Sequence, residues 1–228
     1  MTEVYYFSGS GHSFAVAKSL SEQLHCKITE INGKSEKIPT EETAVVVFPV
    51  YCQNIPAPVK GFLQKATSKY IALIATYGKI SYGNVLYEAQ QSVRGTVIAG
   101  AYIPIGHTFL SGDNSFDETV LSPIAERIKS PQRAHIPKTH KNPLSDIFPA
   151  FRSRIGVKIA KNNPCNNCGL CEKNCPVAAI KNGKINSKCI RCLRCVTNCP
   201  QNALRYKNRP ILKKYLESRY KEEVILYL

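Results

Sequence analysis

The residues from 165 to 200 read Cys165-Asn-Asn-Cys168-Gly-Leu-Cys171-Glu-Lys-Asn-Cys175-Pro176 and then, after a short interval, Cys189-Ile-Arg-Cys192-Leu-Arg-Cys195-Val-Thr-Asn-Cys199-Pro200. Both halves follow the pattern C-x₂-C-x₂-C-x₃-C-P, and together they hold eight of the ten cysteines of the chain. Two copies of one spacing are hard to obtain by chance. The stretch therefore indicates a duplicated metal-binding loop.

Two iron–sulfur clusters explain every position of this pattern. A [4Fe-4S] cube has four iron corners that each take one thiolate, and a C-x₂-C-x₂-C loop can reach three of them. In bacterial two-cluster ferredoxins, the fourth cysteine of each run ligates the other cluster. This rule predicts one cluster on Cys165, Cys168, Cys171 and Cys199, and a second on Cys189, Cys192, Cys195 and Cys175.

Two other interpretations of the cysteines are weaker. Disulfides would suit a secreted chain, but the C-x₂-C spacing favours metal and we find no secretory signal in the sequence. Structural zinc takes four ligands, commonly as two C-x₂₋₄-C pairs, and requires neither a third cysteine in each run nor a fourth before proline. We therefore expect iron–sulfur clusters.

Length and composition allow two domains with packed cores. The chain has 228 residues, of which 43% are hydrophobic. No uninterrupted apolar run reaches the length of a membrane span. The first residues, Met-Thr-Glu-Val-Tyr-Tyr-Phe, begin as a strand rather than as a targeting peptide. We expect cytoplasmic residence, where thiols stay reduced.

The positive charge is concentrated in the C-terminal part. Residues 1–150 hold 14 Lys+Arg against 12 Asp+Glu, whereas residues 151–228 hold 17 against 4. Such a basic surface is expected to be a solvated face or a docking face for an acidic redox partner or an anionic substrate. Nucleic acid is not an expected partner, because no nucleic-acid-binding motif accompanies the charge.

The first loop has the composition of a phosphate-binding loop. Residues 3–7 read as a buried strand, Ser8-Gly9-Ser10-Gly11-His12-Ser13 follows, and helical spacing begins at Phe14. Glycines let the backbone approach an anion, hydroxyls donate hydrogen bonds, and the helix N-terminus faces the charge. The loop is neither a Walker loop nor a Rossmann fingerprint. A short loop rich in hydroxyls and without Lys suits the single terminal phosphate of FMN.

Strands and helices alternate through the first 130 residues. Apolar runs predict strands at 3–7, 44–49, 70–76 and 96–103, and a further strand is predicted at 27–31. Helical spacing predicts helices from Phe14 onward and at 56–67, 83–93 and 116–129. This alternation predicts an α/β fold with a doubly wound parallel sheet, in which ligands bind beyond the carboxyl ends of the strands.

Two of those strand ends carry aromatic and polar residues. Tyr51 and Asn54 follow the third predicted strand, and Tyr77 follows the fourth. The tyrosines could sandwich a planar ring whose edge meets Asn54. Alternatively, both tyrosines merely cap the core. Because three loops converge on one site, we favour a ligand.

These loops, at residues 4–13, 46–58 and 74–83, resemble the FMN-contacting loops of the flavodoxin family. With the cysteine runs included, roughly residues 1–205 resemble the flavodoxin–ferredoxin fusion proteins of anaerobic bacteria and archaea. The resemblance implies a flavodoxin-like sheet of strand order 2-1-3-4-5 and a small C-terminal α+β two-cluster ferredoxin domain. The family's first loop is S-G-T-G-N-S, so Ser10 keeps the hydroxyl and His12 is the departure.

The same resemblance implies three groups of FMN-binding residues. The phosphate would be held by Ser8, Ser10, Gly11, His12 and Ser13. One side of the flavin would be lined by Pro49, Val50, Tyr51, Cys52 and Asn54. The other side would be lined by Thr76, Tyr77, Gly78 and Gly83.

Four segments follow from these assignments. Residues 1–130 form the flavodoxin-like FMN domain, and 131–160 a basic, proline-containing connector with a short helix near 150–161. Residues 161–208 form the ferredoxin domain. Residues 209–228 are expected to be one helix, because apolar residues fall on one face at Leu212, Leu216, Tyr220, Val224 and Tyr227.

The combination predicts an electron-transfer protein that passes single electrons between FMN and two [4Fe-4S] clusters. A redox partner protein would dock on the basic C-terminal half or near the flavin, and a homodimer is left open. One alternative is an FMN-dependent reductase of a quinone or nitro compound, fed by its own clusters. Another is a redox-sensing binding protein that uses its basic half.

No catalytic residues are expected, because no triad or carboxylate pair emerges. The remaining cysteine, Cys26, and the histidines at 25, 107, 135 and 140 receive no role. Basic residues beside the cysteines are expected to raise the cluster potentials by favouring the reduced state, namely Lys173, Lys188, Arg191 and Arg194.

Overall fold

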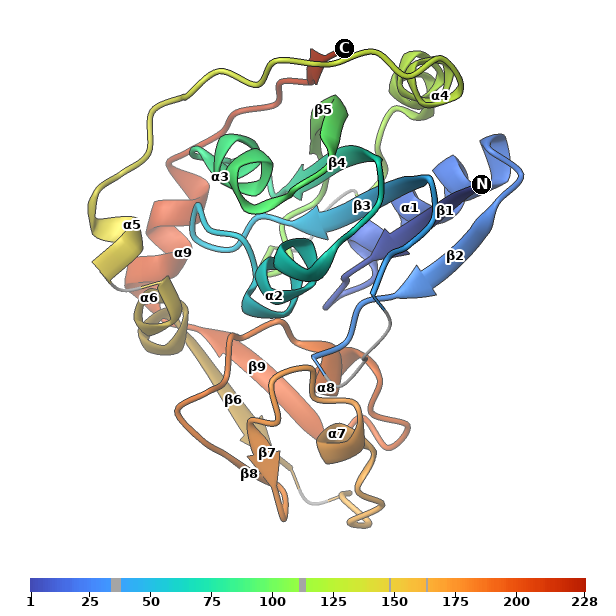
Figure 1. Cartoon of the computed structure of the whole chain (residues 1–228). Coiled ribbons are helices and arrows are strands. Elements are labelled where there is room, and N and C mark those ends of the chain that lie inside the picture. The colour runs from blue at the N-terminus through green and yellow to red at the C-terminus, as the bar shows by residue number, and fades with distance from the viewer. Residues whose placement is uncertain (34–37, 111–113, 148, 163) are drawn as a thin grey trace.

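A twisted parallel sheet organises the first part of the chain in the computed structural model, which describes residues 1–33, 38–110, 114–147, 149–162 and 164–228. Five parallel strands stand in the order β5-β4-β3-β1-β2, so the predicted order 2-1-3-4-5 is confirmed (Figure 1). Each strand matches its predicted span to within one residue at either end. The strands are β1 Thr2–Tyr6, β2 Lys27–Glu30, β3 Thr43–Pro49, β4 Tyr70–Tyr77 and β5 Thr96–Pro104.

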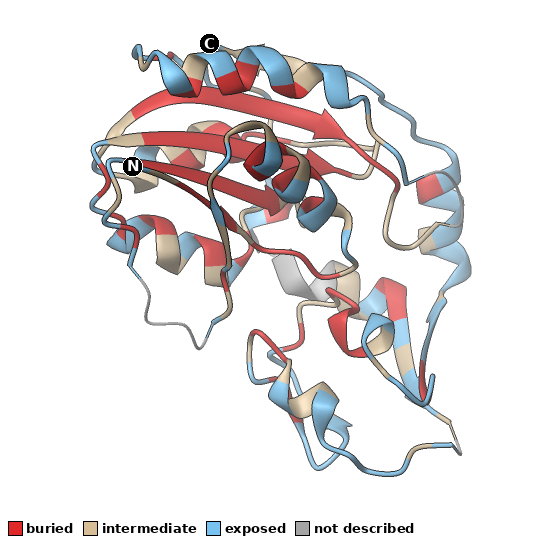
Figure 2. Ribbon diagram, turned by 90° about the vertical axis from the view of Figure 1, so that its right-hand side faces the viewer, coloured by how far each residue is buried: buried red, intermediate tan, exposed pale blue. Residues whose placement is uncertain are grey.

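Helices cover both faces of this sheet. The helices are α1 His12–Gln23, α2 Ala57–Lys65, α3 Val85–Ser92 and α4 Leu121–Lys129, the last preceded by a 3₁₀ turn at Glu118–Val120. Side chains alternate along β3, so that Val46 packs with α2 and α3 while Val45 packs with α1 and α4. Both valines are fully buried, and each such side chain contributes roughly 1.5–3 kcal/mol by burial. Figure 2 shows the buried strands enclosed between the helical layers.

A sixth strand from the C-terminus completes the sheet, which corrects the predicted helix at 209–228. Helix α9 spans only Pro210–Glu217, and β10 Ile225–Tyr227 pairs antiparallel with β5. The Tyr77 hydroxyl holds the approach to β10, since it accepts from Glu223 N and donates to Glu223 O. The apolar run at the C-terminus satisfies the open edge of β5, and this pairing outweighs the helical spacing that the same residues show.

A smaller lobe carries the cysteines. Strand β6 Val157–Lys161 pairs antiparallel with β9 Leu204–Asn208, and β7 Ile180–Lys181 forms a hairpin with β8 Lys184–Ile185. Two short helices lie beside them, α7 Leu170–Lys173 and α8 Arg194–Thr197. The hairpin turns through Asn182 and Gly183, which both have positive φ, as a tight two-residue turn requires.

The connector between α4 and β6 is held against the sheet rather than hanging free. It contains α5 Leu144–Ile147 and α6 Pro149–Gly156, so the helix predicted near 150–161 ends at Gly156 and its last residues belong to β6. Strand pairing with β9 explains that difference. Ala134 N donates to Val97 O, and the extended chain crosses from α4 to α5 in Figure 1. Within the described residues, no helix has both the length and the apolar character of a membrane span.

Candidate functional site

The two cysteine loops have the same backbone shape. The φ angle is positive at three matched pairs of positions, namely Asn167 and Arg191, Gly169 and Leu193, and Ala178 and Asn202. Members of each pair are separated by the offset that separates the two cysteine runs. Left-handed residues turn successive N–H groups toward one concave side, where they can bond sulfur or another anion. The duplicated sequence is therefore a duplicated structure.

The first cysteine group surrounds a cavity of about 380 Å³. Its lining includes the side chains of Cys165, Cys168, Cys171 and Cys199, the four predicted ligands of one cluster. Leu204 and Ile180 close its apolar side, and Cys168 is exposed to solvent. Backbone N–H groups of residues 201–204 lower the pKa of the Cys199 thiol, which favours the thiolate that iron requires.

The second cysteine group is buried. Cys175, Cys189, Cys192 and Cys195 are each 9% exposed or less. Burial, with added repulsion from neighbouring thiols of the group, raises the pKa of Cys192 to about 11 and that of Cys195 to about 12. A bound iron would reverse this effect by stabilising the thiolates.

The donor set fits iron–sulfur clusters. Each group offers four thiols, and the four cysteines of the first group line one cavity. Among the described residues, no three His, Cys, Asp or Glu side chains come close enough to hold a single ion. One backbone N–H in each loop also bonds a ligand sulfur, from Ala179 to Cys175 Sγ at 3.1 Å and from Ala203 to Cys199 Sγ at 3.3 Å.

A second cavity, of about 1020 Å³, opens at the carboxyl ends of β3, β4 and β5. Nine of the predicted FMN-binding residues line it: His12, Pro49, Val50, Tyr51, Cys52, Asn54, Thr76, Tyr77 and Gly78. Its opposite wall comes from α6, α9 and the second cysteine loop. Of the two tyrosines, Tyr51 is half-buried, whereas Tyr77 is 1% exposed and its hydroxyl is bonded to the Glu223 backbone.

The other five predicted residues lie outside this lining. Four belong to the first loop, where the Ser8 hydroxyl accepts from Gly11 N at 3.1 Å and Ser10 Oγ lies 3.0 Å from Thr108 Oγ1. Ser13 is buried and bonds Thr76 Oγ1 at 2.8 Å. Gly11 has a φ of 98° immediately before α1, so the loop does end at a helix N-terminus. Gly83 packs against the Gln53 side chain.

Sequence reasoning missed the loop that follows β5. Residues 105–109 line the cavity beside the first loop. Burial, with a smaller effect of His12, lowers the pKa of His107 to about 4, and burial also lowers the pKa of His12. Gly78 lies so close to His107 that any Cβ at Gly78 would clash with the ring. The sequence did offer one signal, because this loop follows the carboxyl end of a parallel strand as the other three loops do.

A buried arginine joins the two parts of the molecule. Arg194 is 5% exposed and donates from both Nε and Nη2 to Ser8 O, at 3.1 and 2.6 Å. Its Nη2 also lies 2.9 Å from Glu30 Oε1, and its guanidinium lies over the Phe7 ring at 5.3 Å. The second cysteine loop is thereby attached to the first loop of the sheet. From the sequence, Arg194 was expected only to raise the cluster potentials. Its contact with Ser8 was not predicted.

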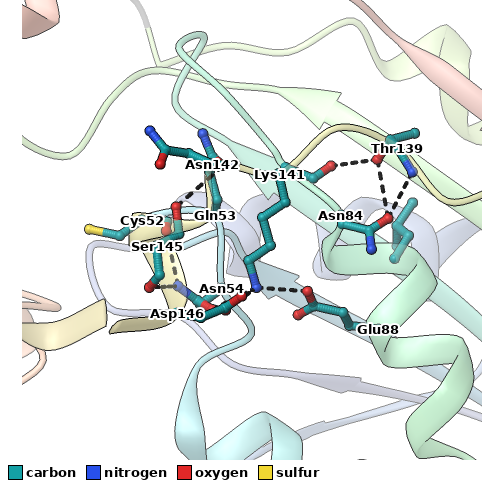
Figure 3. Close-up of polar contacts among 12 residues, drawn as sticks. Cys52, Gln53, Asn54, Asn84, Glu88, Thr139, Lys141, Asn142, Ser145 and Asp146 are labelled. Atoms are coloured by element: carbon teal, nitrogen blue, oxygen red, sulfur yellow. Dashed lines mark hydrogen bonds and ion pairs between the residues drawn. The ribbon is translucent and has the colours of Figure 1, made fainter. Parts of the chain in front are cut away.

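A polar network attaches the connector to α3 and to the loop after β3 (Figure 3). The Lys141 ammonium bonds Glu88 Oε1 at 2.7 Å, Asp146 Oδ1 at 2.5 Å and Asn54 Oδ1 at 3.0 Å. The Asn54 amide donates in turn to Cys52 O and Ser145 O. Asn54 therefore lines the cavity, but its side chain bonds the chain itself and not an open edge of the cavity.

Comparison with known proteins gives a family match in the second cysteine loop. The model of the 4Fe-4S binding domain matches residues 184–205, which include the whole second cysteine run. A comparison with curated proteins found no match.

Several solved structures are similar to the chain. A flavodoxin from the domain Archaea is 19% identical with a TM-score of 0.41, covering 57% of this chain and 99% of its own. A short-chain flavodoxin associated with a PDU bacterial microcompartment is 19% identical with a TM-score of 0.42, covering 57% and 97%. A WrbA-like flavodoxin from Agrobacterium tumefaciens is 16% identical with a TM-score of 0.40, covering 57% and 98%.

The 4Fe-4S match supports a redox role for the chain. The first part has the doubly wound order 2-1-3-4-5, which is the flavodoxin-like topology. The second part is rich in cysteine and contains the matched 4Fe-4S binding domain. The chain thus joins a sheet of flavodoxin-like topology to a cysteine-rich lobe that matches the 4Fe-4S binding domain.

Proposed function

We propose that this protein passes single electrons between an FMN at the carboxyl edge of the sheet and two [4Fe-4S] clusters on its eight clustered cysteines. FMN exchanges one or two electrons and each cluster exchanges one. A chain that holds both can therefore convert between two-electron and one-electron transfer. Residues 1–130 would hold FMN, 161–208 would hold the clusters, and the connector at 131–160 would keep them together. Strand β10 adds a second attachment at the C-terminus.

One observation carries the proposal: the second cysteine loop forms part of the wall of the flavin cavity. Ile190 and Arg191 line the cavity. Gly9, in the first loop, lies so close to Cys192 O that a Cβ there would be 2.2 Å from it. A Cβ at Gly9 would also lie 2.7 Å from the Tyr51 hydroxyl. Burial raises the pKa of that hydroxyl well above its usual value. The cluster of Cys189, Cys192, Cys195 and Cys175 would then be the inner one, next to the flavin.

The first cysteine group would be the outer cluster, where electrons enter or leave. Cys168 is exposed, and the cysteine lobe that carries it has exposed basic side chains at Lys173, Lys184, Lys188 and Arg205. A protein with an acidic face around its own redox centre fits this surface. Electrons would pass from such a partner through the outer cluster and the inner cluster to the flavin, or the reverse.

Anaerobic purification followed by iron, sulfide and FMN analysis of one sample tests the proposal. We expect about eight irons and one FMN per chain, with flavin bands over broad cluster absorption. Titration with a reduced bacterial ferredoxin should then reduce the flavin, and added salt should slow the reaction because the basic surface attracts the donor. Zinc in place of iron, or clusters without flavin, would refute the relay.

A reductase of a small molecule is the second candidate. The cavity extends beyond the flavin-side loops to α6 and α9, which form an apolar wall. A flavin held at those loops could therefore meet a second molecule. Turnover of quinone and nitro acceptors by the reduced protein distinguishes the reductase from a carrier.

A further inference from the structure

Four large hydrophobic side chains form an exposed rim on the larger cavity. They come from three helices, and each lines the cavity while remaining at least 41% exposed: Leu144 of α5, Ile155 of α6, and Ile211 and Tyr215 of α9. Figure 1 shows these three helices together on one side of the molecule. Ile211 is 75% exposed, more than any other large hydrophobic residue of the described chain except Met1. A group of exposed apolar side chains at a cavity mouth marks a candidate binding surface.

Helix α9 presents two of the rim residues on one side. Ile211 and Tyr215 are four residues apart, so their side chains are neighbours on the helix surface. The other side of α9 holds the helix to the molecule, because Leu212 packs closely on Gly156 and Leu216 is buried. The rim is therefore fixed in place by buried neighbours while its own side chains stay in water.

Cations surround the rim. Residues 209–221 hold five Lys+Arg against one acidic residue, Glu217, which lies 3.8 Å from Lys213 in an ion pair. The Arg219 guanidinium lies over the Tyr215 ring at 6.0 Å, so positive charge directly adjoins the rim. Four of the five cations have exposed side chains and are not bonded to the loop after β4: Arg209, Lys213, Lys214 and Arg219. A partner with a negatively charged surface complements this side of the molecule.

An anionic lipid bilayer fits the rim better than the face of an acidic protein does. Interfaces between proteins are poor in Lys, whereas helices that lie on membranes combine Lys or Arg with large apolar side chains. The long stems of Lys213 and Lys214 let their ammonium groups reach lipid phosphates while Ile211 inserts below them. The acidic residue of the cavity lining, Asp146, bonds Lys141 and adds little repulsion.

We propose that the four rim residues and the four flanking cations dock this protein on the surface of an anionic lipid bilayer, with the mouth of the larger cavity facing the membrane. The rim residues would lie at the boundary of head groups and acyl chains, and the cations would contact lipid phosphates. An apolar molecule dissolved in the bilayer would then reach the cavity without crossing water. The docking surface goes beyond electron transfer within the chain and does not depend on flavin binding.

Flotation of the full chain, purified without oxygen, with lipid vesicles tests this assignment. Vesicles of phosphatidylglycerol and phosphatidylcholine should bind the protein at least about tenfold more tightly than phosphatidylcholine alone, and added salt should weaken the binding. Ile211→Ser combined with Tyr215→Ser should lower the affinity about tenfold or more, because the apolar contact is lost. Both side chains are exposed, so the variant should fold. Equal binding to the two kinds of vesicle, or full affinity in this variant, would overturn the proposal.

A matched pair of charge variants separates docking on the rim from attraction by net charge. Lys213→Gln combined with Lys214→Gln should also lower the affinity about tenfold or more. Lys27→Gln combined with Lys65→Gln removes two exposed cations at the opposite edge of the sheet and should lower it less than about twofold. An equal loss in the two variants would refute a specific docking face. Binding to an acidic ferredoxin through Ile211, without binding to vesicles, would make the rim a protein interface and also refute the proposal.

A tryptophan reporter measures insertion directly, because the chain contains no tryptophan. The emission of Ile211→Trp should move to shorter wavelength when anionic vesicles are added, since the ring leaves water. Ile38→Trp is the matched control, because Ile38 is 43% exposed and precedes β3 at the opposite edge of the sheet, and its emission should not move. A shift in both variants or in neither would contradict insertion of the rim. Vesicle binding needs no flavin, so a sample without FMN refutes the relay while these measurements still decide the docking surface.

Discussion

The two cysteine loops have one sequence pattern and one backbone shape, yet the fold puts them in opposite surroundings. Positions that match are Leu170 and Arg194, at the start of α7 and α8. Leu170 is 38% exposed at the surface, whereas Arg194 is buried against the first loop of the sheet. The comparison teaches that ligand chemistry is set by the cysteine spacing, while the role of each loop is set by what the intervening residues contact.

Removal of one ligand from each loop should give the largest difference. Cys195→Ser and Cys168→Ser should each lower the iron content by about half, because each removes a ligand of one cluster. Only Cys195→Ser should also lower the FMN content, since the second loop forms a wall of the flavin cavity. Metal and flavin analysis of anaerobic samples measures both effects. Equal FMN loss in the two variants would contradict the inner and outer assignment.

Substitution at the matched pair Arg194 and Leu170 should separate the loops by stability. Arg194→Gln removes charged hydrogen bonds to Ser8 O and the ion pair with Glu30, and should lower the free energy of unfolding by about 2–3 kcal/mol. Leu170→Ala should cost less than about 1 kcal/mol, because the side chain is partly in water. Anaerobic urea unfolding measures both. A larger loss in Leu170→Ala would show that the contacts of Arg194 with Ser8 and Glu30 contribute little to stability.

A methyl group at Gly9 should strain the contact that only the second loop makes. Gly9→Ala would bring Cβ to 2.2 Å from Cys192 O, so the junction must shift, at a cost of about 1–3 kcal/mol. Gly61→Ala in α2 is the matched control, because a Cβ there meets nothing within 4 Å and Ala favours helix. Thermal unfolding should show a lower midpoint in the first variant only. The same midpoint in both would mean that the loops separate easily.

Mild acid should lower the free energy of unfolding slightly, because of the buried His107. The pKa of His107 is about 4 in the folded chain, below its unfolded value near 6.5. Below pH 6.5 the unfolded chain therefore binds a proton at this histidine that the folded chain does not bind. This contribution to stability is complete above pH 6.5 and declines as the pH falls toward 4. Between pH 7 and pH 5.5 the loss is about 1 kcal/mol. Unfolding midpoints at the two pH values should differ less in His107→Gln, and an unchanged difference would assign the pH effect elsewhere.

Much of the fold follows from local pattern. Apolar runs such as the one at 44–49 located most strands of the five-stranded sheet, because hydrophobic periodicity and turn residues act over a few neighbours. The prediction of one helix over residues 209–228 was wrong, because the same short segment has both helical spacing and the residue types of a strand. The open edge of β5 decided between them, and that edge lies more than a hundred residues away in the chain.

The candidate site divides in the same way. Sequence indicated three of the loops that surround the larger cavity, whereas residues 105–109 and the wall from α6 and α9 were not foreseen. Asn54, which was expected at the flavin edge, lines the cavity and also bonds Lys141, because the connector folds back over its loop. Such contacts join segments that are distant in the sequence, so the sequence of one loop alone does not predict them.

By itself the sequence determined the two sets of thiols, the phosphate-loop composition and the α/β alternation, because spacing and periodicity are local properties of the chain. Tertiary structure decided which cysteine loop faces the cavity, which arginine is buried and which helices close the far wall. The contact of Arg194 with Ser8 spans 186 residues, and a contact between such distant segments forms only when both domains have folded and packed.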